Sequence, residues 1–598
     1  MSRERGASQQ YSRIATLNPR RTAFPWNFDH RTTVNMGKIY PMFAVKTIPG
    51  DTWKLSHEIV IRLHPPAAPM YHEIVATMHY FDIPLRILWS DFEKYYTGGK
   101  LGTDASVMPR WVPEVEDFKK GSLWDYFGFP VNWDNGNWDS SVRPEVLAQY
   151  NYDMPFASDS PNLPTDLLRR AYNTIWDEYY RDVDLQDAMN PDPNDPTGEP
   201  TRPVNNFGTN RMPLPRAWRK DYFTSARIDR QRGTPPALPI YGEATIKSIS
   251  NAPVQIGDSV VTYTDHSPQS IIMAELLRAS HNVHGGHFNI HGSTGSDFRS
   301  ELLHANMQNA TGIVDGSTMT SADIADLRTA VQIQKWMERN MRGGSRFTEV
   351  IHAHFGESPT DDRLDRPKYI GGSKHRISVT EVVQTSATQP DSPQGNMCGH
   401  GLCADEAYIT EYRVKEPSII MGLLSVMPKA GYEDGINRQW LSGSRFEEYW
   451  AEYAHLSEQG IYNCEVYPQG GNPINANGDP IAGRDMDVWG FQGRYDEYRV
   501  AKDFATSEMR VKPAAVPLPN THTMIPFPSL GYWHMLRSFA SLPGLNDHFI
   551  ECNPDRRWMA VSGPAGLEID ECIVNYHCKS VAVRPMPPIA EPGMMDHF

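Results

Sequence analysis

The sequence predicts a mainly β fold in which strands from both ends of the chain share one core. Residues 53–63 alternate apolar and polar side chains, and residues 572–584 do the same near the other end. The apolar members of the first segment are Trp53, Leu55, Ile59, Ile61 and Leu63, with His57 on the same face. A period of two is typical of a strand with one buried face. Distant strands that share a core are typical of closed or sandwich β folds.

Further strands are predicted between these two segments. Residues 38–63 form two strands around the turn Pro49-Gly50-Asp51, because proline presets φ and glycine frees it. Residues 76–89 form a third candidate strand, broken near Pro84. The strand at 572–584 ends where Pro585-Met586-Pro587-Pro588 begins.

Helices and loops fill the middle of the chain. Residues 164–182 and 321–341 carry apolar residues at helical spacing, and Thr320-Ser321-Ala322-Asp323 resembles a capping box. The Pro/Asp-rich stretch within 186–216 and the His/Gly/Ser-rich stretch at 281–300 are predicted loops. We find no internal repeat.

Composition excludes several classes of protein. Six cysteines in 598 residues are far too few for a disulfide scaffold. A net charge of -15 argues against a basic nucleic-acid module, and 11% aromatic residues argue against a disordered chain. The longest apolar run, Ile419–Met427, is too short for a membrane helix, and the first residues lack the apolar region of a secretory signal. We therefore expect a soluble protein of a reducing cytoplasm.

The prolines bear on domain organisation. They number 48 and are spread along the chain, as expected where short strands are joined by long ordered loops. Length alone allows three or four domains, but a single β core with large insertions would have the same length.

Nucleotide-binding, zinc-protease and serine-hydrolase motifs are missing from the sequence. A group of histidines in the glycine-rich stretch could wrap an ion, because neutral imidazoles bind zinc or copper. Its members are His281, His284, His287 and His291. Since no carboxylate or cysteine nearby completes a tetrahedral set, we predict no metal and no cofactor, and His284, His287 and His291 remain weak candidates.

Two further clusters have competing interpretations. Cys398, His400 and Cys403 lack the second ligand pair of a structural zinc site, so we interpret the cysteines as loop thiols. Glu447 and Glu452 lie among aromatic residues, as in a glycosidase cleft. The spacing of Phe446, Tyr449, Trp450 and Tyr453 instead favours a helix or irregular segment with one buried face and one solvated acidic face.

The first 38 residues are locally basic and look extended. They hold seven Lys and Arg against Glu4 and Asp29, so 7 − 2 = +5, and all but one of the cations are arginine. Arginine can take a phosphate bidentately, and a flexible basic arm binds nucleic acid through charge and counterion release. The alternative is a solvated tail.

Several segments resemble the major capsid protein of microviruses, the small single-stranded DNA bacteriophages, and particularly the gokushovirus-like branch. The longest blocks read GKIYPMFAVKTIPGDTWKL at 37–55, RAYNTIWDEYYRD at 170–182 and DLRTAVQIQKWMERNMRGGSRFTEVIHAHFG at 326–356. Shorter blocks are RKDYFTS (219–225), RLDRPKYIGG (363–372), GINRQW (435–440), YDEYR (495–499), LPGLNDHF (542–549) and YHCKSVAVRPMP (576–587). They run in order along nearly the whole chain. The segments 226–233, 395–403 and 517–533 depart from the family pattern.

The resemblance implies an eight-stranded antiparallel jelly roll with long loop and helix insertions. We expect an N-terminal arm at 1–37, a single jelly-roll domain at 38–598, and a surface protrusion inserted at 229–320. The implied function is structural rather than enzymatic: self-assembly into a T=1 icosahedral shell around circular single-stranded DNA, with exposed loops used in host attachment. The implied location is the virion, assembled in the cytoplasm of a bacterial host.

We expect DNA contacts from the arm at Arg3, Arg5, Arg13, Arg20 and Arg21. Because the whole chain is acidic, the resemblance also implies a small basic DNA-packaging protein. Further expected partners are other copies of the chain, minor or pilot capsid proteins, and a host receptor that could be a glycan. Two alternatives stay open: a β-sandwich carbohydrate-active hydrolase using Glu447 or Glu452, and a glycan-binding protein.

Overall fold

The computed structural model describes residues 20–66, 70–99, 106–111, 113, 117–131, 163–189, 210–234, 245–249, 254–256, 259–261, 312–315, 324–343, 352–355, 365–383, 385, 397–470, 485–510, 533–554, 559 and 569–589. The chain divides into two compact units. The first comprises Met1–Arg230 and Gly344–Phe598, and the second comprises Gln231–Gly343.

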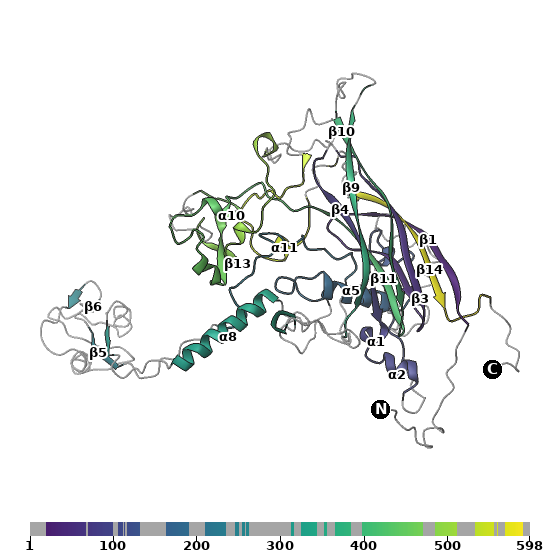
Figure 1. Ribbon diagram of the computed structural model, residues 1–598, viewed down its shortest axis with the longest axis horizontal. Coiled ribbons are helices and arrows are strands. Elements are labelled where there is room, and N and C mark those ends of the chain that lie inside the picture. Colours follow the sequence, from purple (N-terminus) through teal and green to yellow (C-terminus); the bar gives the residue numbers. More distant parts are fainter. Residues whose placement is uncertain are drawn as a thin grey trace, which may run out of the picture. The chain divides into compact units, whose positions relative to one another are not determined.

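Eight antiparallel strands build the first unit (Figure 1). They are β1 (Thr22–Val34), β2 (Tyr40–Lys46), β3 (Thr52–Leu63), β4 (Ile74–Pro84), β9 (Lys368–Val383), β10 (Met397–Arg413), β11 (Ser418–Pro428) and β14 (Cys572–Arg584). The order is β1-β14-β3-β10-β9-β4-β11-β2. Two four-stranded sheets, β1-β14-β3-β10 and β9-β4-β11-β2, are thus joined through the β9–β10 pair. This is a jelly roll, and it confirms the predicted fold class.

Strands from opposite ends of the chain pair directly. β14 pairs with β1 from Thr22↔Arg584 to Val34↔Cys572, and on its other side with β3. The predicted turn at 49–51 separates β2 from β3, but these strands do not form a hairpin: β2 pairs with β11, whereas β3 pairs with β14 and β10. The turn therefore carries the chain from one sheet to the other.

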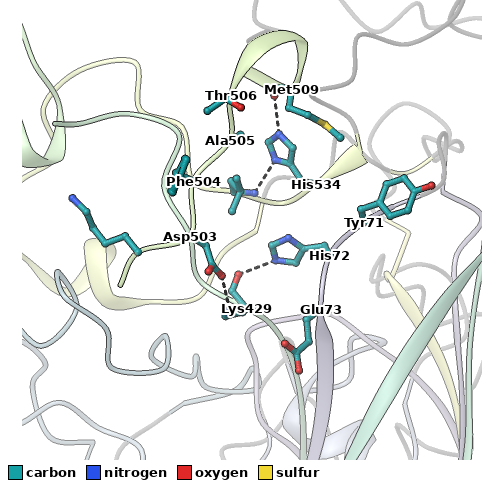
Figure 2. A pocket seen from close by; sticks show the side chains of 12 residues that line it. Tyr71, His72, Glu73, Lys429, Asp503, Phe504, Ala505, Thr506, Met509 and His534 are labelled. Carbon is teal, nitrogen blue, oxygen red and sulfur yellow. Dashed lines mark hydrogen bonds and ion pairs between the residues drawn. The ribbon is translucent and has the colours of Figure 1, made fainter. Parts of the chain in front are cut away.

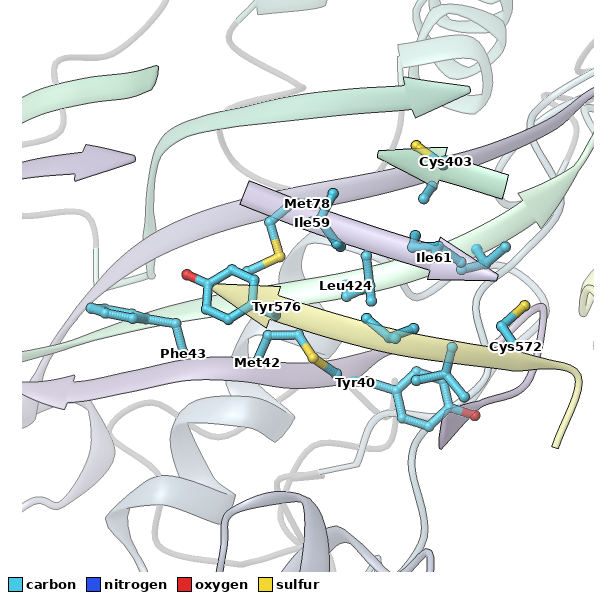
Figure 3. Packing of buried hydrophobic residues seen from close by; sticks show 14 of the residues in the cluster. Tyr40, Met42, Phe43, Ile59, Ile61, Met78, Cys403, Leu424, Cys572 and Tyr576 are labelled. Atoms are coloured by element: carbon cyan, nitrogen blue, oxygen red, sulfur yellow. The ribbon is translucent and has the colours of Figure 1, made fainter. Parts of the chain in front are cut away.

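The main core lies between the two sheets (Figure 3). Alternate residues of β3 are almost completely buried, as the period-two pattern predicts. Tyr576 of β14, Phe43 of β2 and Leu424 of β11 meet them from the other strands. Aromatic rings make up much of this layer; Phe43, for example, lies edge-on to both Trp53 and Tyr80, with centroids 6.0 Å apart in each pair. Such edge contacts add to the stability from burial alone.

The sheet β9-β4-β11-β2 is also covered on its outer face. Helices α1 (Leu85–Leu88) and α5 (Leu167–Tyr179) belong to a second apolar cluster that contains Phe81, Met421 and Leu423. Every residue of β11 is buried as a result. This explains why the apolar run at 419–427 shows no alternation, because a strand buried on both faces needs none.

Helix α5 confirms the helix predicted at 164–182, but it is buried on almost all sides. Arg169 and Arg170 both bind the buried carboxylate of Asp166, at 2.9 Å each, and Arg170 also donates to the Leu88 carbonyl oxygen. These bonds satisfy charges that burial would otherwise make costly. The tyrosine Tyr172 donates to the Ile39 carbonyl oxygen at 2.8 Å, which ties the helix to the start of β2.

The remaining elements of the first unit are short. They are α2 (Phe92–Thr97), α3 (Leu123–Tyr126), η3 (Arg438–Trp440), η4 (Ala451–His455), β12 (Glu458–Tyr462), α10 (Asn463–Val466), β13 (Val488–Gly493), η5 (Asp496–Tyr498), η6 (Ser507–Arg510) and α11 (Asp547–Ile550). The second unit contains β5 (Thr245–Ile249), β6 (Val254–Ile256), β7 (Ser259–Val261), β8 (Gly312–Asp315) and α8 (Ile324–Gly343), with β5 paired to β8 and β6 to β7. α8 confirms the helix predicted at 321–341. Among the described helices, none has the length and apolarity to span a membrane.

Two segments differ from the sequence-based expectation. Thr22–Val34, assigned to the extended arm, forms β1 and alternates between exposed and half-buried side chains. Phe24, Trp26 and Phe28 alternate with exposed residues, so the sequence did carry the period-two signal of this strand. Cys398 and Cys403 lie in strand β10, not in a loop, and both are free thiols.

We predict that Gly37→Ala prevents stable folding. Gly37 has φ +78° in the turn between β1 and β2, and an added Cβ would overlap the carbonyl oxygen of Cys552. Gly128→Ala is the matched control, since Gly128 has φ +82° but open space around it, so only the conformational cost of about 1–2 kcal/mol applies. Soluble yield and thermal unfolding midpoints check this. Equal midpoints for the two variants would contradict the predicted overlap.

Candidate functional site

A buried polar network crosses the core between the two sheets. The Nε2 atom of His57 in β3 is 3.2 Å from the Nε2 atom of His375 in β9. On the other side of the ring, His57 Nδ1 is 3.0 Å from the hydroxyl oxygen of Tyr80 in β4. That hydroxyl is 2.8 Å from the hydroxyl of Tyr576 in β14. The far ring nitrogen of His375 binds Asp405 of β10 at 2.8 Å. One chain of hydrogen bonds thus links five strands.

The electrostatics of this network follow from burial. Desolvation, with a smaller contribution from His375, lowers the pKa of His57 to about 4, so the ring is neutral at pH 7. Desolvation also raises the pKa of Tyr80 far above its usual value. Asp405 lies at the surface, and its hydrogen bond with His375 lowers its pKa. His57 and Tyr80 are therefore uncharged at pH 7, and the carboxylate of Asp405 lies at the solvent end of the network.

Part of the network has the connectivity of a serine-hydrolase triad. Ser373 Oγ is 2.7 Å from His375 Nε2, and His375 Nδ1 faces Asp405. Ser373 Oγ also lies 3.3 Å from His57 Nε2, so it sits between two imidazole rings inside the sandwich. A nucleophile needs access to a substrate carbonyl. The arrangement instead satisfies buried polar groups, which is a structural role.

The cleft shown in Figure 2 has a volume of about 580 Å³. His72 Nε2 lies 2.8 Å from the Lys429 carbonyl oxygen, Lys429 Nζ pairs with Asp503 at 2.6 Å, and His534 Nε2 lies 2.9 Å from the Met509 carbonyl oxygen. Burial, followed by the nearby His534, lowers the pKa of His72. Two lysines and two carboxylates line the cleft, so its charges balance and it has no net attraction for an anion.

The acidic aromatic segment forms turns and short 3-10 helices, with no long helix. The side chains of Phe446, Tyr449 and Trp450 are exposed, so the buried face predicted for them is wrong. The Glu447 carboxylate accepts hydrogen bonds from the backbone N–H groups of Gly443 and Ser444. These bonds stabilise a turn.

The predicted nucleic-acid and metal residues lie largely outside the described part of the chain. Arg3, Arg5 and Arg13 are outside it, as are His281, His284, His287 and His291. Arg20 and Arg21 are exposed and directly precede β1. Arg21 lies beside the β2–β3 turn, since a Cβ built on Gly50 would be 3.4 Å from its Nη2. Within the described residues no group of three or more His, Cys, Asp or Glu could hold a metal ion.

Sequence reasoning noted His57 on the buried face of its strand but did not identify the network. The sequence signal that could have indicated the network was the position of His57, a titratable residue on the apolar face of a strand with period-two alternation. Its partners His375 and Asp405 come from strands more than 300 residues away, so their meeting depends on the sheet order.

Comparison with known proteins decides between a structural and an enzymatic role. A family described as "Capsid protein (F protein)" matches residues 12–141 and 161–594. The chain belongs to this capsid protein family. It is 30% identical over 628 aligned positions to capsid protein VP1 of Chlamydia phage 1, covering 98% of this chain and 97% of the relative. It is 26% identical to capsid protein VP1 of Bdellovibrio phage phiMH2K, with 98% of each chain covered, and 26% identical to capsid protein VP1 of Spiroplasma virus 4, with 94% of each covered.

These relatives confirm the resemblance to the gokushovirus-like branch of microviruses. This capsid protein is a structural component of the virion, not an enzyme, and its family membership means that copies assemble with one another into a capsid. The hydrolase alternative built on Glu447 and Glu452 has no support from the family, and the exposed turn around these residues explains the acidic aromatic pattern in another way.

We predict that acid weakens the capsid protein through His57. In the unfolded chain the pKa is about 6.5, against about 4 in the folded chain. The unfolded state binds the proton first, so stability is greatest above pH 6.5 and falls as the pH decreases from 6.5 to 4. The loss is up to about 3 kcal/mol, at 1.36 kcal/mol per pKa unit. Urea midpoints followed by tryptophan fluorescence at pH 7 and pH 4.5 measure it.

His57→Gln is expected to make the midpoint less dependent on pH over this range, because glutamine does not titrate. His548→Gln is the control, since the His548 side chain is 84% exposed. A His57→Gln variant with the full wild-type pH dependence would show that the network does not carry the acid sensitivity.

Proposed function

We propose that this capsid protein assembles into a T=1 icosahedral shell that encloses a circular single-stranded DNA genome. The observation that carries the proposal is the complete eight-strand jelly roll in a chain whose family match runs from residue 12 to residue 594. A jelly roll offers a rigid wedge whose insertions are free to form contacts with neighbouring copies. A chain with one core and long insertions is suited to a T=1 shell, in which every copy makes the same contacts with its neighbours.

The charge distribution supports DNA binding by the N-terminal arginines together with a separate basic protein. The arginines Arg3, Arg5, Arg13, Arg20 and Arg21 precede β1, where a basic segment can contact phosphates without sequence preference. The whole chain carries -15, so it does not neutralise a genome by itself. A small basic packaging protein would supply the missing positive charge. Minor or pilot capsid proteins complete the particle, which is assembled in the cytoplasm of the bacterial host.

The insertion between the RKDYFTS and DLRTAVQIQK blocks supports a role in host attachment. The predicted surface protrusion comprises residues 229–320, and the second compact unit covers Gln231–Gly343. A unit with its own compact folding can vary without disturbing the jelly roll, which suits binding to a host receptor, including a surface glycan.

Electron microscopy of the purified protein tests the shell. We expect closed isometric particles of uniform size and a reconstruction in which all copies are equivalent, as T=1 requires. Monomers, open sheets or a shell with several distinct subunit environments would contradict the proposal.

Removal of residues 1–21 tests the basic segment. The deletion leaves β1 intact, since that strand begins at Thr22, so shells are expected to form while DNA content falls. The ratio of absorbance at 260 and 280 nm and nuclease protection of the packaged DNA measure the loss. Truncated particles with a full genome would refute a DNA-binding role.

Two full-length variants separate charge from length. Replacing the five arginines by glutamine is expected to reproduce the deletion, whereas replacing them by lysine retains most of the DNA because phosphate attraction depends chiefly on charge. Equal DNA content in the two variants would contradict an electrostatic role.

A further inference from the structure

Five aromatic side chains of the first unit are at least half exposed around the buried residue Tyr495. They are Trp440 (79% exposed), Phe446 (53%), Tyr449 (56%), Trp450 (50%) and Tyr498 (51%), and we call them the Tyr495 surface. Single exposed apolar residues are ordinary, but a contiguous group marks an interaction site.

Contacts to Tyr495 and to its neighbour Arg494 hold the segments that carry these rings together. Arg494 donates to the Phe446 carbonyl oxygen at 3.1 Å. The Tyr495 ring lies 4.9 Å from that of Tyr449 and 6.2 Å from that of Tyr498. Its hydroxyl donates to the Glu448 carbonyl oxygen at 2.9 Å and accepts from the Trp450 backbone N–H at 3.2 Å. Trp440 joins through its neighbour Gln439, whose side chain donates to the Glu497 carbonyl oxygen at 2.7 Å.

The backbone at Tyr495 is held in an unusual conformation. Its φ is +66°, in the left-handed region that a bulky residue rarely adopts. Such strain persists only where the surroundings fix it, and it is concentrated at functional positions. The two hydrogen bonds of the Tyr495 hydroxyl and the guanidinium of Arg494, 4.6 Å above the ring, provide that fixation. The exposed rings are thereby ordered before any partner binds, which lowers the entropy cost of binding.

Charge separates a protein partner from DNA. Segments 438–456 and 494–499 contain four arginines and five carboxylates, so 4 − 5 = −1. A nucleic-acid surface would combine aromatic rings with a clear excess of positive charge. Interleaved charges of both signs around exposed Trp, Tyr and Phe rings instead match the rim and centre of a protein interface.

The area fits a contact within a shell. Five aromatic side chains, each about half exposed, offer on the order of 500 Å². A stable interface buries about 800 Å² per partner, so these rings would supply more than half of one. We propose that the Tyr495 surface is a contact between neighbouring copies of this chain in the capsid. The inference rests on capsid assembly, which the family establishes, and it names one surface that assembly buries.

Hydroxyl-radical footprinting with mass spectrometry tests the contact on wild-type protein. Oxidation of Trp440, Tyr449 and Trp450 is expected to fall at least fivefold in DNA-free particles compared with dissociated, folded subunits. Trp53 is completely buried and must stay unreactive in both preparations, which verifies that the subunits remain folded. Equal oxidation in particles and subunits would overturn the proposal even though particles form. Protection that appears only in DNA-filled particles would assign the surface to nucleic acid and overturn it as well.

Substitution gives a second test. Trp440→Glu places a charge in the proposed contact, and because Trp440 is exposed, the thermal midpoint of the subunit is expected to be unchanged. The protein concentration needed for particle formation should rise at least tenfold, measured by sedimentation. Trp440→Phe keeps the contact apolar and should assemble like the wild type. Wild-type assembly by a folded Trp440→Glu variant would refute the proposal.

Discussion

The pairing of β14 between β1 and β3 is the constraint on which the remaining structure depends. It joins residues more than 500 positions apart, over the full length of β1. Because the first and last strands of the jelly roll are neighbours, everything between them must leave and re-enter the sandwich at strand ends. Among the described residues of these insertions, helices α1 and α5 pack on the outer face of one sheet. Contacts between such distant residues impose a large loop-closure cost, which the aromatic core between the sheets offsets.

The two sheets differ in what covers them, and this decides which strands could be predicted. The outer face of β1-β14-β3-β10 carries charges, such as Lys579 between Glu58 and Glu406 at 2.9 and 3.1 Å, so β3 and β14 alternate visibly in the sequence. α5 covers β11, which removes its alternation. β1 lies at an edge and follows the arginines of the basic segment, so the alternation of Phe24, Trp26 and Phe28 within it was missed. The resemblance to a known family supplied the jelly roll; the residue pattern alone reached only a closed or sandwich β fold.

Sites were harder to predict than strands because their members come from distant segments. The spacing of Phe446, Tyr449 and Trp450 predicts a helix with a buried face. Instead, the Tyr449 ring packs on Tyr495 and the Trp450 backbone N–H binds the Tyr495 hydroxyl, about 45 residues further along the chain. Period and propensity describe neighbours in sequence, whereas this arrangement depends on a hydroxyl that binds two backbone groups of another segment. The same limit applies to His57, whose partners in β9 and β10 become neighbours only through the sheet order.

Because the core is complete within one chain, the exposed aromatic residues around Tyr495 need an explanation other than core packing. The sandwich buries its own apolar faces within one chain, and the hydrogen-bonded network at His57 satisfies the polar groups that it encloses. The jelly roll therefore folds without the rings around Tyr495, and their exposure is not a consequence of an unfinished core. A left-handed tyrosine costs stability in the isolated subunit. On our proposal, contacts of the Tyr495 surface between copies in the capsid offset this cost, because many modest interfaces act together.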